Sequence, residues 1–300
     1  MIDNIKVSLP IRLPSKFWKH AEDKKDFFKH FYIFPRYHYI EKGLLYKYEG
    51  SLENLKITIF KKTETLPDRL IIENSWHKFL KGNNHTNYTF SDLEATVLNL
   101  EEILSLSIME ADIKRMEYGC NIKMQSETVY NYLFLARGKE FHNMLDNGEI
   151  YGKKLHRDKY TFKCYNKKYQ SNLKDKDGLL RIEMESKCKG YLRSAKIPVV
   201  QVKDLLIRDN LKLLGKDLMK KYDLIEKRVI PDLDELTPNQ MNLWAAMNER
   251  VTRNYYKKNK PNTFKKYKKK LAEIIATANH EIHDEFTSKV TDKWNYLISN

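Results

Sequence analysis

The sequence predicts an α+β protein in which helices pack on one face of an antiparallel sheet, followed by a smaller all-helical region. Three observations support this prediction. Segments that alternate apolar and polar residues recur up to residue 187, helical spacing appears between them, and only helical spacing continues beyond Pro198. We therefore divide the chain into residues 1–198 and residues 199–300.

The first half of the predicted sheet comes from residues 1–73. Residues 1–14 alternate Ile2, Ile5 and Val7 with polar residues and predict an edge strand, and residues 15–31 have helical spacing. Two strand-like runs follow within residues 44–62, and a strand over 70–73 leads toward a loop at 82–84.

The second half alternates helices and strands. Residues 89–107 predict a helix capped by Ser91, with Glu94 three residues later. Residues 112–124 predict a strand, residues 126–137 the start of a helix, and residues 159–168 and 179–187 two more strands. Helical periods then cover 202–222, 237–251 and 263–286, where Thr237 and Pro238 form a helix start.

The composition favours a polyanionic partner. The net charge is +15, from 55 Lys and Arg against 40 Asp and Glu. Such an excess is typical of nucleic-acid binding, because neutralised phosphates release counterions. A lysine-rich surface without any such partner is the alternative. The 41% hydrophobic content is sufficient for a core.

The cysteines and the apolar runs exclude several other classes. The three cysteines show no CxxC spacing, so we expect neither a disulfide framework nor a thiolate zinc site, and a cytoplasmic location fits. No apolar run reaches about 18 residues, and the amino terminus does not read as a signal peptide, so we expect no membrane association. Neither a phosphate-binding GxxxxGK[ST] loop nor a GxSxG nucleophile elbow occurs.

Three carboxylates lie within or beside the predicted strands. Glu73, Glu117 and Glu183 each have apolar neighbours, so each needs a partner for its charge near a core. Hard divalent cations such as Mg²⁺ or Mn²⁺ prefer oxygen ligands, and these three residues are our predicted metal ligands. The alternative is that all three face solvent on the open side of the sheet.

The segment YTFKCYNKKYQ, residues 160–170, contains a candidate nucleophile. The hydroxyl of Tyr165 or Tyr169 attacks phosphorus poorly, because its pKa lies near 10, unless a cation stabilises the oxyanion. Lys167 and a bound metal would supply that stabilisation. An ordinary cross-strand aromatic pair is the alternative.

The helical tail combines lysines with aromatic residues. Phe264, Tyr267 and Leu271 fit the buried face of an amphipathic helix, and the lysines between them fit phosphate contacts on the other face. The predicted DNA-contacting residues of this tail are Lys265, Lys266, Lys268 and Lys269.

In this order, the motifs resemble the phage and plasmid replication initiators related to the gene-two protein of filamentous phages. The similar segments are MIDNIKVSLP, IIENSWHKFLKGNN, IKRMEYGCNI, TFKCYNKKYQ and LLRIEMESKCKGYLRSAKIP, and the helical segments LTPNQMNLWAAM and NTFKKYKKKLAE extend the similarity over nearly the whole chain. The family more often has Asp at the position of Glu117. It often has proline in the segment that here contains Trp76 and His77.

The resemblance implies a sequence-specific, metal-dependent DNA nickase with an endonuclease fold related to the two-histidine superfamily, although the His-hydrophobe-His pair is absent. Residues 1–198 would nick DNA and residues 199–300 would bind it. Tyr165 would be the nucleophile, Lys167 would offset charge, and Tyr169 would be a second nucleophile when the circle closes, a step that water or a hydroxyl could also perform. Further predicted DNA contacts are Lys78, Asn83, Asn84, Arg115 and Arg181.

The implied partners are a single-stranded or extruded replication origin, a host helicase and a polymerase in a bacterial cell, with the protein a monomer or a dimer. Two alternatives stay open: a non-catalytic nucleic-acid-binding protein such as a repressor, and a relaxase or transposase of a mobile element that uses the same tyrosine chemistry.

Overall fold

The structure is a computed structural model of the chain. It describes residues 1–12, 37–41, 44–61, 67–125, 129–171, 178–187, 189–227, 236–276 and 281–300. The helix predicted over 15–31 lies outside these residues.

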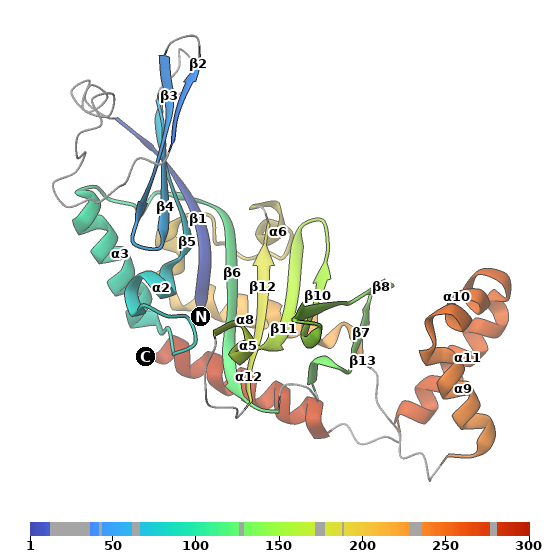
Figure 1. Ribbon diagram of the computed structural model, residues 1–300. Coiled ribbons are helices and arrows are strands. Elements are labelled where there is room, and N and C mark those ends of the chain that lie inside the picture. The colour runs from blue at the N-terminus through green and yellow to red at the C-terminus, as the bar shows by residue number, and fades with distance from the viewer. Residues whose placement is uncertain are drawn as a thin grey trace.

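The described strands form one large antiparallel sheet and one small sheet (Figure 1). The large sheet has ten strands in the order β2-β3-β4-β5-β1-β6-β12-β11-β10-β9. Their bounds are β1 Ile2–Ile11, β2 Tyr37–Glu41, β3 Leu44–Leu52, β4 Leu55–Phe60, β5 Asp68–Ser75, β6 Asp112–Lys123, β9 His142–Asp146, β10 Glu149–His156, β11 Tyr160–Asn166 and β12 Leu179–Ser186. The predicted α+β class with an antiparallel sheet is confirmed.

Strand β1 lies in the middle of the sheet, so the prediction of an edge strand is wrong. It pairs with β5 on one side and with β6 on the other. Its apolar side chains at Ile2, Ile5 and Val7 are buried, as a central strand requires. The spacing of apolar residues predicts a strand here, but it does not reveal how many neighbours the strand has.

The helices are interspersed with the strands and then dominate the end of the chain. Their bounds are α2 Trp76–Lys81, α3 Phe90–Leu104, α5 Lys167–Ser171, α6 Lys189–Ser194, α7 Val202–Leu205, α8 Arg208–Asp223, α9 Pro238–Asn248, α10 Arg250–Asn259, α11 Pro261–Ala276 and α12 Glu281–Ser299. Thr237 is the N-cap of helix α9, as predicted, and its side chain accepts from the backbone amide of Gln240. Helix α3 is capped by Thr89 and Asp92 rather than by Ser91.

One short strand corrects the sequence-based prediction. Residues 133–136, predicted as part of a helix, form β7 (Leu133–Ala136), which pairs with β8 (Lys139–Glu140) and with β13 (Ile225–Lys227). Ser126, the first residue of the helix predicted over 126–137, lies outside the described residues. The apolar run at 133–136 is too short for its period to separate a strand from a helix.

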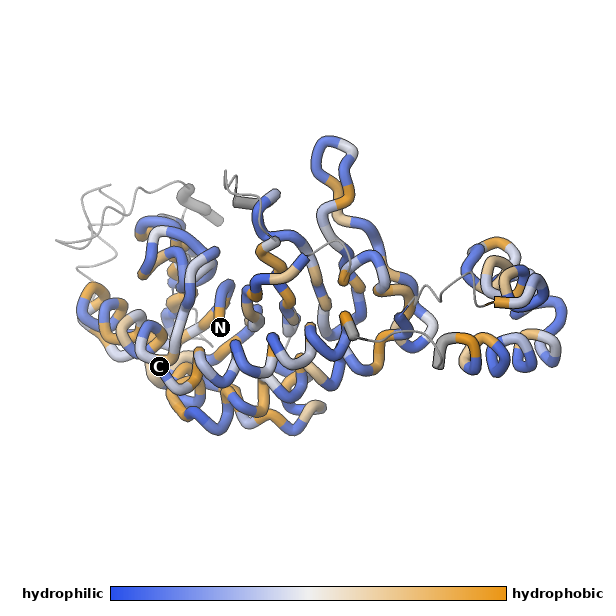
Figure 2. Tube along the Cα trace, turned by 90° about the horizontal axis from the view of Figure 1, so that it is seen from below, coloured by the Kyte–Doolittle hydropathy of each residue, from blue (hydrophilic) through white to orange (hydrophobic). Residues whose placement is uncertain are grey.

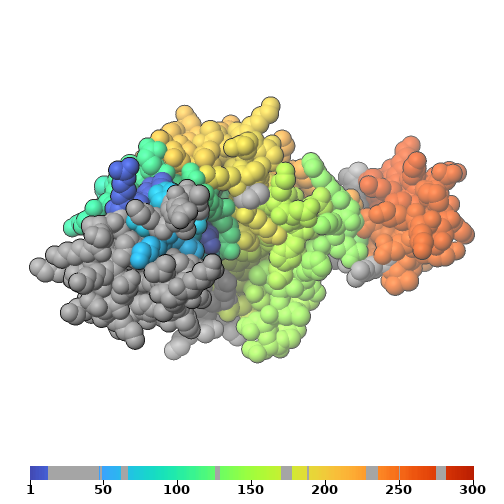
Figure 3. Space-filling view, turned by 90° about the horizontal axis from the view of Figure 1, so that it is seen from above, coloured from blue at the N-terminus to red at the C-terminus, as the bar shows by residue number. Residues whose placement is uncertain are grey.

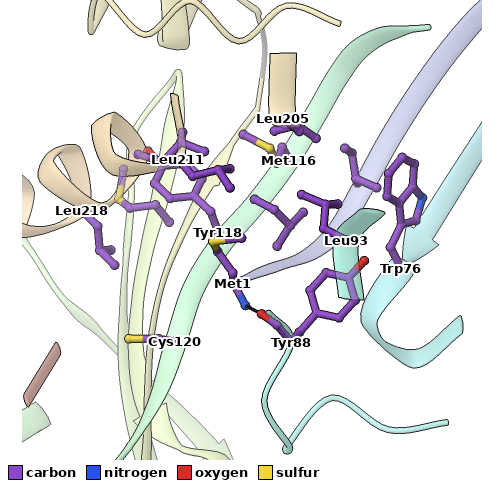
Figure 4. Packing of buried hydrophobic residues seen from close by; sticks show 14 of the residues in the cluster. Met1, Trp76, Tyr88, Leu93, Met116, Tyr118, Cys120, Leu205, Leu211 and Leu218 are labelled. Carbon is purple, nitrogen blue, oxygen red and sulfur yellow. Dashed lines mark hydrogen bonds between the residues drawn. The ribbon is translucent and has the colours of Figure 1, made fainter. Parts of the chain in front are cut away.

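One face of the large sheet is apolar and covered by helices, and the other carries polar side chains. On β6, the side chains of Met116, Tyr118 and Cys120 are buried on the side that α8 and α12 contact (Figure 4). The intervening residues Glu117 and Asn121 point to the opposite, polar face. Figure 2 shows that the packed helices mix hydrophobic and hydrophilic residues along their length, as expected for amphipathic helices.

Helices α9, α10 and α11 contact one another and form a lobe beside the sheet (Figures 1 and 3). Helices α8 and α12 contact β6 instead. The helical region that follows the sheet is thus partly packed on it and partly separate. The division at residue 198 stays a prediction.

No helix among the described residues is long and apolar enough to cross a membrane.

Candidate active site

Strands β6, β12 and β11 place their polar side chains side by side. Glu183 lies opposite Lys163 on one neighbouring strand and Gly119 on the other, and Arg181 lies opposite Tyr165 and Asn121. Because side chains alternate along a strand, this register brings the polar residues of all three strands to one face.

Two glycines leave space for this arrangement. A Cβ at Gly119 would lie 2.7 Å from the Cβ of Glu183, and a Cβ at Gly152 would lie 2.2 Å from the Cβ of Tyr165. Both distances are shorter than non-bonded carbon atoms tolerate, so a larger residue would displace the site side chains. Glycine at these two positions of the neighbouring strands therefore leaves room for the side chains of Glu183 and Tyr165.

Three buried carboxylates form the centre of the site. Asp3 from β1, Glu117 from β6 and Glu183 from β12 each place one oxygen within 4.8 Å of the others. Asp3 also accepts hydrogen bonds from Ser75 and, at 3.0 Å, from Asn84 Nδ2. Three carboxylates this close repel one another unless cations lie between them.

Two cations, the half-buried Lys163 and the buried Arg181, link the carboxylates. Lys163 Nζ lies 2.9 Å from Glu117 Oε1 and 2.8 Å from Glu183 Oε1. Arg181 donates from Nε to Glu183 Oε2 at 2.5 Å and from Nη2 to Asp3 Oδ2 at 2.9 Å. The result is a nearly continuous chain of opposite charges, with three negative and two positive groups.

This network shifts the pKa of each member. Burial and the charge of Glu183 raise the pKa of Glu117. Burial alone would raise the pKa of Glu183 too, but Arg181 and Lys163 outweigh burial and lower it to about 2. Glu183 is therefore the ionised acceptor of the site, and Glu117 is the carboxylate that is easier to protonate.

Tyr165 lies against this network with its side chain almost fully buried. Its hydroxyl donates to Glu183 Oε2 at 3.3 Å, and its ring packs edge-on against Tyr151. Burial and the negative charge of Glu183 raise the pKa of the Tyr165 hydroxyl well above 10. With this raised pKa the Tyr165 hydroxyl is neutral in the free protein. A nucleophilic role therefore requires a change in the charges that contact Glu183.

Lys167 adjoins both Tyr165 and a cavity. Its Nζ lies 5.8 Å from the centre of the Tyr165 ring, and its side chain is 1% exposed. Burial and the charge of Arg181 lower the pKa of Lys167 to about 8. A nearby anion would stabilise its charged form.

The cavity has a volume of about 530 Å³ and is lined by amides and lysines. The lining residues are Asn4, Asn54, Asn74, Ser75, Lys78, Gly82, Asn83, Asn84, His85 and Lys167. Asn4 and Asn84 also donate to Glu117 and Asp3, at 2.5 Å and 3.0 Å, so the cavity wall continues into the carboxylate cluster. Amides and lysines suit phosphate oxygens and the edges of bases.

Several predicted site residues therefore lie together. The charge network contains Glu117, Glu183, Arg181 and Tyr165. The cavity beside it is lined by four more predicted site residues: Lys78, Asn83, Asn84 and Lys167. Asn83 also stabilises the loop that follows it, because its Oδ1 accepts hydrogen bonds from the backbone amides of residues 85 and 86.

Glu73 does not join the carboxylate cluster. Its Oε2 lies 2.9 Å from Lys6 Nζ, and its Oε1 lies 3.6 Å from Arg115 Nη2. Arg115 also approaches Glu185, at 3.7 Å. These residues form a half-exposed ion-pair row farther along the polar face. The metal role of Glu73 and the DNA contact of Arg115 stay predictions.

Tyr169 lies on a different element from Tyr165. Strand β11 ends at Asn166, and Tyr169 lies on α5, where its hydroxyl donates to Glu149 Oε2 at 3.0 Å and its ring stacks on Tyr151. The four-residue spacing of Tyr165 and Tyr169 therefore does not place them on one face of a continuous strand. Tyr169 is 36% exposed, whereas Tyr165 is 2% exposed.

The predicted tail lysines lie on α11 of the lobe. All four are exposed: Lys265, Lys266, Lys268 and Lys269. The inner side of the same helix carries Phe264, Tyr267 and Leu271, which are half-buried. The predicted combination of a packed face and a basic face agrees with the structure, whereas DNA contact by these lysines stays a prediction.

Sequence reasoning missed Asp3 and Lys163. Asp3 has no distinguishing local pattern, and only the central position of β1 brings it to Glu183 and Arg181. Lys163 carried a usable signal, because it shares the strand parity of Tyr165.

The comparisons with known proteins give one structural likeness. A solved structure of a rolling circle replication initiator protein from Geobacillus stearothermophilus aligns with a TM-score of 0.43 and 12% sequence identity, over 82% of this chain and 94% of that chain. A TM-score this low does not establish a common fold. The sequence matches no protein-family profile and no curated protein.

Proposed function

We propose that the protein is a DNA nickase that initiates rolling-circle replication by tyrosine transesterification. One observation carries the proposal. The hydroxyl of Tyr165 is bonded to Glu183 inside a cluster of three carboxylates and two cations, next to a cavity lined by amides and lysines. Phosphoryl transfer needs these parts: a nucleophile, positive charge for the phosphoryl oxygens, and a place for the substrate.

The carboxylate cluster fits a divalent cation. Asp3, Glu117 and Glu183 offer only oxygen ligands, they carry more negative charge than Lys163 and Arg181 neutralise, and the pKa of Glu117 is raised as expected of an under-compensated carboxylate. Mg²⁺ or Mn²⁺ would be held by Asp3 and Glu117 and would polarise a phosphoryl oxygen, which leaves Glu183 to accept the proton of Tyr165. Glu73 would need to leave Lys6 in order to contribute.

The chain's own residues would prepare the nucleophile. When a phosphodiester enters, its oxygens compete with Glu183 for Lys163 and Arg181. Glu183 then loses the partners that lower its pKa and becomes a better acceptor for the proton of Tyr165, 3.3 Å away. Substrate binding would thus activate a hydroxyl that is inert in the free protein.

The reaction exchanges one phosphodiester for another. The Tyr165 oxygen forms a bond to phosphorus as the bond from phosphorus to the 3′-oxygen breaks, leaving a 5′-phosphotyrosine. The proton of Tyr165 passes to Glu183 and then to the leaving 3′-oxygen. Lys167 would offset charge on the phosphoryl group, and the 3′-hydroxyl would serve a host polymerase.

Covalent capture tests this proposal. The protein is incubated with a library of single-stranded oligonucleotides and Mn²⁺, and protein–DNA adducts that resist SDS are measured. We expect an adduct with wild type, none with Tyr165→Phe, and a retained adduct with Tyr169→Phe, the matched control from the same segment. Sequencing the attached DNA would identify the origin. An undiminished adduct with Tyr165→Phe would refute the proposal.

A second candidate is a non-catalytic DNA-binding protein. The observation that favours it is the state of Tyr165, which is buried and has a raised pKa. This candidate predicts DNA binding without any adduct, even with the origin sequence and Mn²⁺. A relaxase or transposase with the same tyrosine chemistry would instead form the adduct, and its genetic neighbours would distinguish it.

A further inference from the structure

A second cavity lies on the helix-covered side of the sheet. It has a volume of about 730 Å³ and is bounded by the β10–β11 turn, the end of α6 and the carboxyl-terminal half of α8, with Arg137 from the β7–β8 turn. Tyr160, the first residue of β11, lines it. Tyr165 lies five positions later on the same strand, so its side chain points to the opposite face. This cavity is therefore separate from the candidate active site.

Positive charge dominates the lining. Seven basic residues stand against two acidic ones, Asp158 and Asp217. The basic residues are Arg137, Arg157, Lys159, Lys196, Lys216, Lys220 and Lys221. Within the part of the chain that the structure describes, Lys221 forms an ion pair and the other six form none. Their mutual repulsion would be relieved by an anionic ligand.

The floor of the cavity is already ordered. Asp217 is 7% exposed, and its Oδ2 accepts from the hydroxyls of Tyr118 at 2.7 Å and Tyr191 at 2.5 Å. Its Oδ1 lies 3.3 Å from Lys221 Nζ. The negative charge of Asp217 is thus compensated inside the protein, and it does not oppose an anion in the cavity.

Two aromatic rings form part of the wall. The rings of Tyr160 and Tyr191 lie 5.1 Å apart, and Lys221 Nζ lies 5.6 Å and 5.3 Å from their centres. This arrangement holds Lys221 in place through cation–π contacts. It also offers apolar surface beside the cations, where a sugar or a base could pack.

From these observations we propose that this cavity binds the phosphodiester backbone of DNA flanking the nicked strand. The inference rests on the proposed function for the identity of the polyanion. The basic residues come from four separate segments, so they suit a row of phosphates rather than one phosphate group. DNA supplies such a row, with one charge per about 1.7 Å of duplex axis.

The test compares two double variants that lose the same charge. Lys216→Gln/Lys220→Gln removes two cations of the cavity. Lys203→Gln/Lys289→Gln removes two exposed lysines outside it, which pair with Glu110 at 2.8 Å and Glu285 at 2.5 Å. Affinity for a duplex carrying a single-stranded extension is measured by fluorescence anisotropy over a series of salt concentrations.

We expect the cavity variant to lower the slope of log affinity against log salt by about two and to bind about tenfold more weakly at moderate salt, whereas the control behaves as wild type. Equal salt slopes for the two variants would overturn the inference. If ATP binds wild type but not the cavity variant, while duplex affinity is the same in both, the ligand is a nucleotide and the DNA assignment is wrong.

The adduct assay separates this inference from the proposed function. The two cavities lie on opposite faces of the sheet, so we expect an oligonucleotide of a few nucleotides around the nicked bond to leave the second cavity empty, and the cavity variant should form the adduct as wild type does. Loss of the adduct in the cavity variant would contradict a separate site. A wild type that forms no adduct but shows the expected difference in salt slope would refute the nickase and leave the DNA-binding cavity supported.

Discussion

Positive charge is buried and paired on the polar face of the sheet, whereas it is exposed on the lobe of α9–α11. On the sheet, Arg181 is 3% exposed and bonded to Glu183 and Asp3. In the lobe, residues 250–276 carry ten Lys and Arg residues against one acid, Glu273. The predicted DNA-contacting lysines there are exposed.

The difference separates two tasks. Burying an ion pair has a desolvation penalty, which only close contact between the two charges offsets. Removing one partner therefore leaves the other charge buried and unpaired. An exposed lysine costs little and contributes little to folding, but it attracts a polyanion over the Debye length. We therefore expect substitutions on the sheet to alter stability and chemistry, and those in the lobe to alter DNA affinity alone.

The largest expected effect is that of Arg181→Met. Asp3 would then lose its ion-pair partner and Glu183 would keep Lys163 alone, so the free energy of unfolding should fall by about 3–5 kcal/mol. Chemical denaturation measures this loss. Lys269→Met in the lobe serves as the control and should stay within about 0.5 kcal/mol of wild type. Equal effects for both would remove the distinction between the two regions.

Next in size is the effect of neutralising the lobe. Replacing Lys265, Lys266, Lys268 and Lys269 by Gln should lower DNA affinity about a hundredfold at moderate salt and reduce the salt slope by up to about four. The free energy of unfolding should change by less than about 0.5 kcal/mol. A stability loss comparable to that of Arg181→Met would show that these lysines support the fold instead.

A smaller effect distinguishes two carboxylates of the network. Glu183→Gln should destabilise by about 2 kcal/mol, because charged hydrogen bonds from Arg181 and Lys163 are weakened. Glu117→Gln should cost less than about 1 kcal/mol, because it also relieves the repulsion from Glu183.

The pH dependence checks this difference. The pKa of Glu183 is lowered to about 2, so its contribution is present above its usual pKa of 4.5 and is lost as the pH falls from there toward 2. The destabilisation by Glu183→Gln should therefore shrink over that range in denaturant titrations. A pH-independent loss would mean that ionisation of Glu183 is irrelevant.

The smallest effect concerns Lys167. The pKa of Lys167 is about 8, so above this pH the free protein carries a neutral Lys167 that must take up a proton when a phosphate binds. Oligonucleotide affinity should therefore fall about threefold between about pH 7.5 and 8.5. The same shift should raise the free energy of unfolding from about pH 8 to 10.5, since the unfolded chain keeps the proton. Lys167→Arg should abolish the decline in affinity, and an unchanged decline would exclude Lys167 as its source.

Part of the site was predictable from local patterns. Glu117, Tyr165 and Glu183 were placed on strands by alternation, and the strands proved to be neighbours. Glu73 has the same local pattern, yet it pairs with Lys6 instead of joining the cluster. Apolar neighbours indicate that a carboxylate needs a partner, but they do not identify the partner.

Local sequence was sufficient to predict the alternation of β6, β11 and β12, the amphipathic period of α11 and the excess of positive charge, because each is a property of neighbouring residues or of composition. The position of β1 between β5 and β6 follows from long-range strand pairing, and this pairing brings Asp3 to Arg181, 178 positions away in the chain. Strand pairing depends on the complementarity of distant segments and on what covers each face, which a local period does not encode.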